Sequence, residues 1–288
     1  MGPHPAEFPI ETSHAWVKAQ GNRAHHHPFP VHWMCTLIVL HRCDPDAPVV
    51  VAANRDEFHE RPTEGPTLRE VSQNGRRIAA PRDLRAGGTW LGVNDAGVFA
   101  AVTNRRSKAS DPERRSRGWL VIEALALGSA REAAERMADA PERAYNPFNF
   151  FVADAESAHL VSYADAPECR DLEPGLHVVG NLHPDESSPK LERLRREAEP
   201  LTEPGAATPE ALAAMCRDHG PSPGSALDAT CVHAGDYGTG SSTLLRTGRR
   251  PLLHFSEGPP CRTPYRDSTP LLHALGTVPV PEGVQARG

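Results

Sequence analysis

The stretch that decides the fold is Met-Cys-Thr-Leu-Ile-Val-Leu at residues 34–40, where a cysteine follows an internal methionine and begins an apolar run typical of a buried strand. If the mature chain starts at Cys35, this residue carries both a thiol nucleophile and a free α-amino group that can act as its base. A cysteine opening an apolar run is more often a small core residue. The surrounding sequence must therefore decide between the two interpretations.

The residues before Cys35 look unlike the rest of the chain. They hold no apolar stretch long enough for a signal peptide or a membrane span, and they are rich in His, Pro and Gly. We expect residues 1–34 to be an extension or propeptide that is disordered or removed. Translation from Met34 with aminopeptidase trimming needs no special chemistry and is favoured over self-cleavage. The histidines at 25–27 and His32 would suit a metal or haem, but the sequence offers no matching ligand set elsewhere, which favours a solvated tract.

Length and charge limit the classes of function that this chain can have. After the extension about 255 residues remain, enough for one domain, which we place at residues 35–270 with a tail at 271–288. The net charge is −6 and there is no long basic block, so we expect no nucleic-acid partner and interpret the basic run at 114–117 as a solvated loop. The six cysteines show no Cys-x-x-Cys spacing. We therefore expect reduced thiols in a cytoplasmic protein, with neither a zinc site nor disulfides.

The hydrophobic pattern predicts an α+β protein. Paired helices interrupt runs of strands, which implies a layered arrangement of sheet on sheet with helices outside. The expected strands lie at residues 35–41, 48–53, 77–80, 89–93, 97–103, 147–153, 159–163, 177–179, 242–246 and 251–255, and the expected helices at about 117–127, 130–138, 190–199 and 209–217. The Gly87-Gly88 pair predicts a tight turn that brings its backbone close to the first strand, with Trp90 in the core or lining a pocket.

Four polar residues follow the second apolar run. The strand period places Arg55 and Glu57 on one face and Asn54 and Asp56 on the other. A cation near Cys35 would lower the pKa of its thiol, and a carboxylate would hold its α-amine. A strand that runs out into a solvated loop is the alternative interpretation.

The order of several motifs resembles the NRDE family, which includes relatives of transport and Golgi organisation protein 2. The motifs are Met-Cys-Thr-Leu at 34–37, Asn-Arg-Asp-Glu at 54–57, Ala-Gly-Gly-Thr-Trp-Leu-Gly-Val-Asn at 86–94, Ala-Val-Thr-Asn-Arg at 101–105, Ser-Arg-Gly at 116–118, Asn-Pro-Phe-Asn at 146–149 and Gly-Leu-His at 175–177, continuing to Asn181. The resemblance covers most of residues 34–256. It implies a four-layer αββα sandwich of the N-terminal nucleophile (Ntn) hydrolase type, similar to penicillin V acylase and bile salt hydrolase.

The resemblance also implies roles for individual residues. Cys35 matches the nucleophile, and Asn104 and Asn181 resemble the oxyanion-hole asparagines of the amidases, although both would also suit strand ends or turns. Arg55 matches the family arginine, while the spacing leaves open whether Asp56 or Glu57 holds the amine. We expect contacts to substrate from the side chains of Asn54, Glu57, Trp90 and Thr103.

The chain departs from its relatives at two places. Gly240 stands in Tyr-Gly-Thr-Gly-Ser-Ser, where relatives often have an arginine, so a candidate anion contact is lost. The usual Pro-Trp-Pro-Lys after the second asparagine is reduced to Ser-Pro-Lys at 188–190. Substrate recognition is therefore expected to differ from that of relatives, or activity to be lost.

The sequence thus favours a cytoplasmic cysteine amidohydrolase or acyltransferase. It would act on a small non-peptide amide or ester through an acyl-Cys35 intermediate, with no cofactor or metal and no insertion into a membrane, and a homo-oligomer is compatible with it. The alternative is a non-catalytic carrier of haem or lipid on the same fold. Gly240 and the blocked amine of Cys35 in the full chain favour that alternative.

Overall fold

A computed structural model describes residues 35–71, 75–107, 110–221 and 224–276. All elements below belong to the unit of residues 32–288. The predicted extension at 1–34 lies outside the described residues.

The first sheet contains β1, which begins directly after Cys35. Its strand order is β10-β1-β2-β12-β13-β14, with the short β11 paired to β12, and every pairing is antiparallel. The strands are β1 (Thr36–Asp44), β2 (Ala47–Phe58), β10 (Gly175–Val179), β11 (His233–Ala234), β12 (Tyr237–Arg246), β13 (Leu252–Ser256) and β14 (Arg266–Asp267). Because β1 and β2 form a hairpin in the middle of this sheet, the start of β1 lies beside the polar end of β2.

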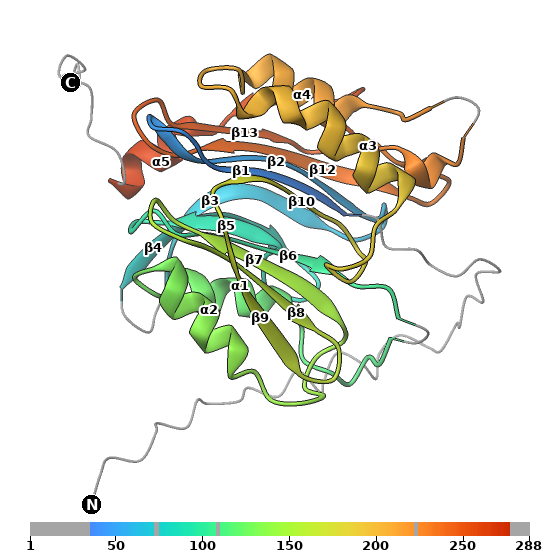
Figure 1. Cartoon of the computed structure of the whole chain (residues 1–288). Helices are drawn as coiled ribbons and strands as arrows, with labels where there is room; N and C mark the ends of the chain where they lie inside the picture. Colours follow the sequence, from blue (N-terminus) through green and yellow to red (C-terminus); the bar gives the residue numbers. More distant parts are fainter. Residues whose placement is uncertain (1–34, 72–74, 108–109, 222–223, 277–288) are drawn as a thin grey trace, which may run out of the picture. The chain divides into compact units, whose positions relative to one another are not determined.

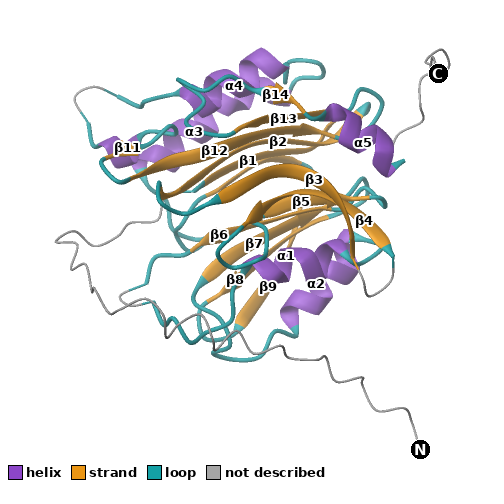
Figure 2. Ribbon diagram, turned by 180° about the vertical axis from the view of Figure 1, so that it is seen from behind, coloured by secondary structure: helices purple, strands orange, loops and turns teal. Residues whose placement is uncertain are grey.

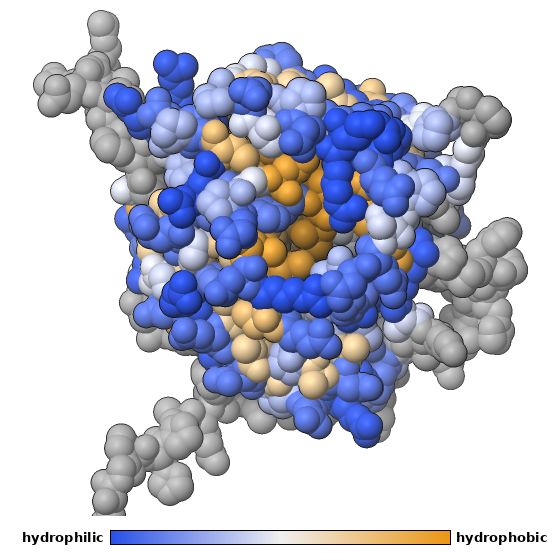
Figure 3. All heavy atoms as spheres, viewed as in Figure 1, coloured by the Kyte–Doolittle hydropathy of each residue, from blue (hydrophilic) through white to orange (hydrophobic). Residues whose placement is uncertain are grey.

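The second sheet is a meander in which each strand pairs with its neighbour in the chain, from β3 to β9. Its strands are β3 (Thr63–Val71), β4 (Arg76–Asp83), β5 (Leu91–Asn94), β6 (Phe99–Asn104), β7 (Phe148–Ala153), β8 (Ala158–Tyr163) and β9 (Pro167–Leu172). The two sheets pack face to face through a shared apolar core that contains Leu37, Val51, Phe99 and Phe151. On the face shown in Figure 3, apolar residues gather in a hollow framed by polar ones.

Helices cover the outer face of each sheet (Figures 1 and 2). The helices α1 (Gly118–Leu125) and α2 (Ala130–Ala138) form an apolar cluster with β4, β6, β7 and β8, while α3 (Pro189–Ala198) and α4 (Pro209–Arg217) form one with β1, β2 and β12. Short 3₁₀ turns follow at η2 (Glu199–Thr202) and η3 (Ala226–Asp228). The layers are thus helix, sheet, sheet, helix, which confirms the predicted αββα sandwich. None of the described helices is both long and apolar enough to cross a membrane.

Most predicted elements are present because their local signals are strong. Helices at 130–138 and 209–217 begin and end where the pattern placed them, and α2, α3 and α4 each begin at a Ser or Thr whose hydroxyl accepts the N–H three residues on. The sequence missed β3 and β9, which are short of apolar residues. The prediction of a loose tail after Pro270 was wrong for residues 271–275, which belong to α5 (Thr269–Leu275) and bury Leu272 and Leu275 in the core between the sheets.

The Gly87-Gly88 turn packs against a different element from the one predicted. Gly87 has a φ of 77°, and a Cβ on Gly88 would lie 2.5 Å from the carbonyl carbon of Gly118, at the start of α1. Thr89 N–H donates to the Gly118 carbonyl oxygen at 3.1 Å, which fixes this contact. The turn therefore brings its backbone against α1 rather than against β1.

The substitution Gly88→Ala should destabilise the fold by about 1–3 kcal/mol, because the added methyl meets backbone that has no room to move. Gly240→Ala is the matched control, since its Cβ would have 3.9 Å to the nearest atom, the Arg55 carbonyl oxygen. Urea unfolding of both variants measures the two free energies. Equal stability of both variants would contradict the close contact.

Candidate active site

Cys35 lies at the entrance to β1, next to the polar end of β2. Thr36 pairs with Asn54, and the Cys35 thiol donates to the carbonyl oxygen of Asp56 with 3.7 Å between sulfur and oxygen. Burial and the nearby Asp56 carboxylate raise the pKa of the Cys35 thiol to about 12, although Arg55 opposes the shift. The thiol is therefore protonated at neutral pH, and a nucleophile at this position needs a base to remove its proton.

Asp56 is a buried carboxylate with one oxygen unused. Its Oδ1 accepts a hydrogen bond from Thr239 Oγ1 at 2.5 Å, whereas its buried Oδ2 has no hydrogen-bond partner in the part of the chain that the structure describes. Burial raises its pKa to about 7, while Lys190, the Thr239 hydroxyl and Arg55 hold the pKa down. An unsatisfied buried oxygen is costly, so Oδ2 is an acceptor available to a donor close to Cys35.

The opposite face of β2 opens into a cleft of about 270 Å³. Arg55 lies 3.5 Å from Glu57 and 3.9 Å from Asp83, and its guanidinium lies 4.6 Å from the centre of the Trp90 ring. Arg61 completes the network with a 2.6 Å contact to Asp83 and a 3.6 Å contact to Glu57. Glu57 is thus held by two arginines, while the neighbouring Asp56 carboxylate accepts from Thr239 in β12.

The two predicted oxyanion asparagines flank Cys35. Asn104, at the end of β6, lines the main cleft together with Cys35, and Asn181 lines a smaller cavity that also contains Cys35 and Lys190. The Asn181 side-chain amide donates to the Asn104 carbonyl oxygen, which ties the two positions together. The structure therefore brings Cys35, Asn104 and Asn181 to one place.

Two predicted substrate contacts point elsewhere. The Asn54 amide donates to the carbonyl oxygens of Cys216 at 2.8 Å and Thr230 at 2.9 Å, which joins β2 to the segments that carry them. The Thr103 hydroxyl donates to the Gly180 carbonyl oxygen at 2.7 Å and so holds the loop that carries Asn181. Neither side chain lines the cleft, whereas Trp90 and Glu57 do. Asn54 and Thr103 therefore position the surroundings of the site.

Sequence reasoning missed two cations near Cys35. Arg117, expected in a solvated loop, lines the cleft, where it donates to the Pro147 carbonyl oxygen at 3.2 Å and makes no ion pair with a described carboxylate. Burial and Arg61 lower the pKa of Arg117 to about 10. Lys190, in α3, is 5 % exposed, and burial lowers its pKa while Asp56 and Cys35 raise it. Both residues stand in motifs that the family resemblance had marked, Ser-Arg-Gly and Ser-Pro-Lys.

Comparison with known proteins identifies the family. The model of the family described as Transport and Golgi organisation 2 matches residues 34–258. The chain belongs to the Transport and Golgi organisation 2 family. The match begins one residue before Cys35, so it includes the whole of the site described above.

Relatives in this family match to different extents. The chain is 28% identical to the Bos taurus Transport and Golgi organization protein 2 homolog over 241 residues, which are 73% of this chain and 85% of the relative. It is 32% identical to the Mus musculus homolog over 141 residues, which are 46% of this chain and 50% of the relative. The latter match thus spans half the length of the mouse protein.

A solved structure supports the fold. A Caenorhabditis elegans N-acylethanolamine-hydrolyzing acid amidase ortholog superposes with a TM-score of 0.53 at 13% identity, covering 73% of this chain and 92% of that one. At this identity the likeness concerns the fold alone. This Transport and Golgi organisation 2 family member therefore has the αββα fold of Ntn hydrolases, as the sequence predicted.

The raised pKa of Asp56 predicts a pH dependence of stability. The folded chain keeps this proton up to about pH 7, while the unfolded chain loses it near the usual pKa of 3.8. Between these values the folded state binds more protons, so the contribution of Asp56 to the free energy of unfolding falls as pH rises. Asp56→Asn retains an acceptor for Thr239 and cannot ionise. Its stability relative to the parent should rise by up to about 4 kcal/mol between about pH 4 and about pH 8.

Urea unfolding of the parent and the variant at both pH values measures this difference. The parent chain is its own control, because every other titrating group is common to both proteins. A difference that does not change with pH would show that Asp56 is ionised in the folded state at low pH.

Proposed function

We propose that this protein is a cysteine amidohydrolase of the N-terminal nucleophile type, active once Cys35 is the first residue. The single observation that carries the proposal is the unused, buried Oδ2 of Asp56 beside Cys35. In the 288-residue chain the Cys35 nitrogen is part of a peptide bond and cannot act as a base. Cleavage before Cys35 would create an α-ammonium whose N–H groups give Asp56 the donor that it lacks.

The reaction then follows from the residues around Cys35. The neutral α-amine takes the thiol proton as the sulfur attacks the substrate carbonyl. The side-chain amides of Asn104 and Asn181 donate hydrogen bonds to the developing oxyanion. The α-ammonium returns that proton to the leaving amine as the carbon–nitrogen bond breaks. A water molecule next attacks the acyl-Cys35 thioester and gives one proton to the α-amine. As the carbon–sulfur bond breaks, the α-ammonium passes that proton to the Cys35 sulfur, so the carboxylic acid leaves and the free thiol and the neutral amine are restored.

The charges of the cleft favour a small, acidic substrate. Arg55 and Arg61 are neutralised by Glu57 and Asp83, but Arg117 faces the same cleft without a carboxylate of its own among the described residues. A cleft of about 270 Å³ suits a short acyl amide with a carboxylate close to the scissile bond. An acyltransferase would use the same acyl-enzyme with an amine in place of water.

Cleavage before Cys35 should switch the activity on. A specific protease site placed directly before Cys35 allows the folded full chain to be cut, and hydrolysis of N-acyl amino acids is followed by mass spectrometry. We expect turnover only after the cut, and loss of at least about 10³-fold in Cys35→Ser, because the nucleophile is then a poorly ionised hydroxyl. Cys169→Ser, at an exposed position on β9, is the matched control. Equal turnover before and after the cut would exclude the α-amine as the base.

The role of Arg117 can be measured with two substrates of equal length. Hexanoylglycine carries a carboxylate where hexanoylethanolamine carries a hydroxymethyl group. The cut enzyme should prefer the glycine amide in kcat/KM, and Arg117→Ala should reduce that preference about 10- to 100-fold, as expected for one charge-assisted hydrogen bond. Arg115→Ala is the control, since Arg115 is paired with Glu123 at 3.4 Å. An unchanged preference in Arg117→Ala would assign the acid recognition to another group.

A non-catalytic carrier of haem or lipid is the second candidate. The raised pKa of the Cys35 thiol and the peptide-bonded nitrogen of Cys35 in the full chain favour it. Titration with haemin, followed by absorbance, tests this function in the full chain and in Cys35→Ala. Binding that survives the substitution, together with no hydrolysis after cleavage, would favour the carrier over the amidohydrolase.

A further inference from the structure

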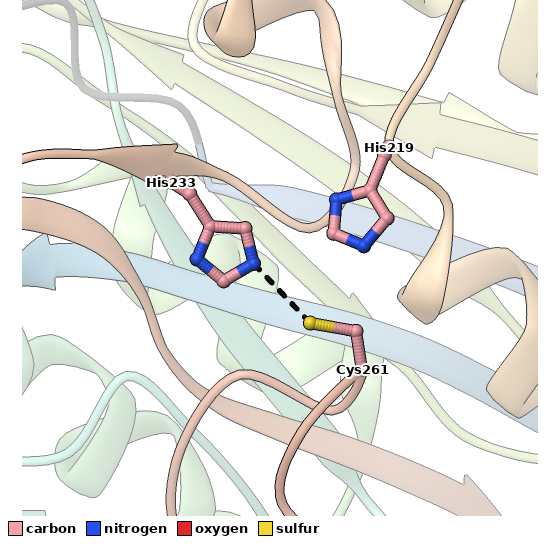
Figure 4. Close-up of side chains that lie close together, drawn as sticks. All are labelled: His219, His233 and Cys261. Atoms are coloured by element: carbon pink, nitrogen blue, oxygen red, sulfur yellow. Dashed lines mark hydrogen bonds between the residues drawn. The ribbon is translucent and has the colours of Figure 1, made fainter.

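A second cluster of reactive side chains lies apart from the cleft. His219 follows α4, His233 is in β11, and Cys261 lies in the turn after β13, and one potential ligand atom from each lies within 4.8 Å of the other two. Figure 4 shows the Cys261 sulfur pointing toward the His233 ring, with the His219 ring beside them. Cys231 adds a second sulfur, 3.5 Å from Cys261 Sγ and 3.7 Å from His233 Nε2.

The distances among Cys231, Cys261 and His233 match those around a tetrahedral metal ion, and a ligand atom of His219 lies within 4.8 Å of His233 and Cys261. Zinc bonds of about 2.3 Å to sulfur and about 2.0 Å to nitrogen imply separations of about 3.8 Å between two sulfurs and about 3.5 Å between sulfur and nitrogen. The cluster shows 3.5 Å between its sulfurs, and 3.2 and 3.7 Å from His233 Nε2 to Cys261 and Cys231. The His219 and His233 rings have centroids 5.3 Å apart.

The backbone around the ligands is held in place without a metal. The Cys231 N–H donates to the Asp218 carbonyl oxygen at 2.8 Å. Cys231 is therefore bonded directly to the residue before His219. Val232 N–H donates to Thr239 Oγ1, and Thr239 N–H donates back to the Val232 carbonyl oxygen, both at 2.9 Å. These bonds fix Cys231 and His233 on either side of Val232 and limit the rearrangement that metal binding requires.

Two other interpretations of the cysteine pair fit less well. A disulfide needs sulfurs about 2.05 Å apart, and these lie 3.5 Å apart. Simple burial of two core thiols explains Cys231, which is fully buried, but it does not explain why two imidazoles converge on the half-buried Cys261. Two sulfurs and two imidazole nitrogens form the donor set that tetrahedral zinc prefers.

We propose that Cys231, His233, Cys261 and His219 bind one zinc ion in a closed, four-coordinate structural site. On binding, each thiol releases one proton and its sulfur bonds to the ion, while each neutral imidazole donates one nitrogen lone pair. The two thiolates balance the charge of Zn²⁺, so the site is neutral and involves no oxidation or reduction. This proposal does not depend on the proposed hydrolase activity. It replaces the expectation from the sequence that the cysteines form no zinc site.

The site would brace one wall of the candidate active site. Thr239, which is bonded to Val232, also donates to Asp56, and Asn54 donates to the carbonyl oxygen of Thr230, directly before Cys231. The ion would thus link the loop after α4, β11 and the turn after β13 behind the residues that hold Asp56. Its role is that of a structural metal, since Cys35 and the cleft contribute no ligand to it.

Metal content and cobalt spectra of the full 288-residue chain test the site. Chain purified with a reductant and without chelator should contain one zinc per molecule. After zinc is removed, added Co²⁺ should give the visible bands of a tetrahedral ion and near-ultraviolet thiolate charge-transfer bands. Cys261→Ser should greatly reduce the near-ultraviolet thiolate charge-transfer bands. His219→Ala should weaken zinc binding by more than the roughly 10- to 100-fold that loss of an outer-shell partner costs.

Matched controls separate this site from other cysteines and histidines. Cys169→Ser changes an exposed thiol outside the cluster, and a variant with alanine at residues 25–27 removes the histidine tract. Both should keep one zinc per chain. Because His219 is exposed, its alanine variant should also keep the fold, which circular dichroism checks.

Three results would overturn the proposal. The first is a reduced, folded chain that takes up neither zinc nor cobalt. The second is metal binding that Cys261→Ser and His219→Ala leave unchanged. The third is a disulfide between Cys231 and Cys261 in protein whose thiols were alkylated at the moment of lysis, which mass spectrometry would detect by the loss of two hydrogens.

Discussion

The pairing of β1 with β2 is the constraint on which the rest of the site depends. It places Cys35 beside the polar end of β2, which is almost completely buried: Asp56 is only 1 % exposed. Burying a carboxylate without its full set of donors is unfavourable, and Lys190, the Thr239 hydroxyl and Arg55 compensate for it in part. The architecture thus places a buried carboxylate with one unsatisfied oxygen directly beside Cys35.

The two faces of β2 divide the work of the site. On one side, Asn54 and Asp56 make buried hydrogen bonds to Cys216 and to Thr239 in β12. The other presents Arg55 and Glu57 to an open cleft. Fixed hydrogen bonds and cleft charges thus come from alternate residues of a single strand, so the charge of the cleft can change while the bonds of Asn54 and Asp56 stay the same.

The sequence predicted the elements with strong local signals and missed those without them. The hydrophobic pattern located β1, α2 and α4, whereas β3 contains Gly65 and Pro66 and has charged residues at a sheet edge, so no local pattern marks it. Strand period gave the relative facing of Asn54 to Glu57, but it could not say which face meets the cleft, and so Asn54 was assigned to the substrate. The side chains of the proposed zinc site are spread over residues 219–261 and meet only through tertiary packing, which spacing rules do not detect.

The contact between Gly88 and Gly118 has a consequence for how this cleft diversifies. Arg117 is the residue directly before α1, and the start of α1 is set by two backbones that touch with no side chain between them. The position of the Arg117 charge in the cleft therefore depends on the close backbone contact between Gly88 and Gly118. A scan of sequence variation would score these glycines as functional, although neither carries a reactive group. Substitution of Arg117 would change the charge of the cleft without disturbing the fold, whereas substitution of either glycine would disturb the start of α1.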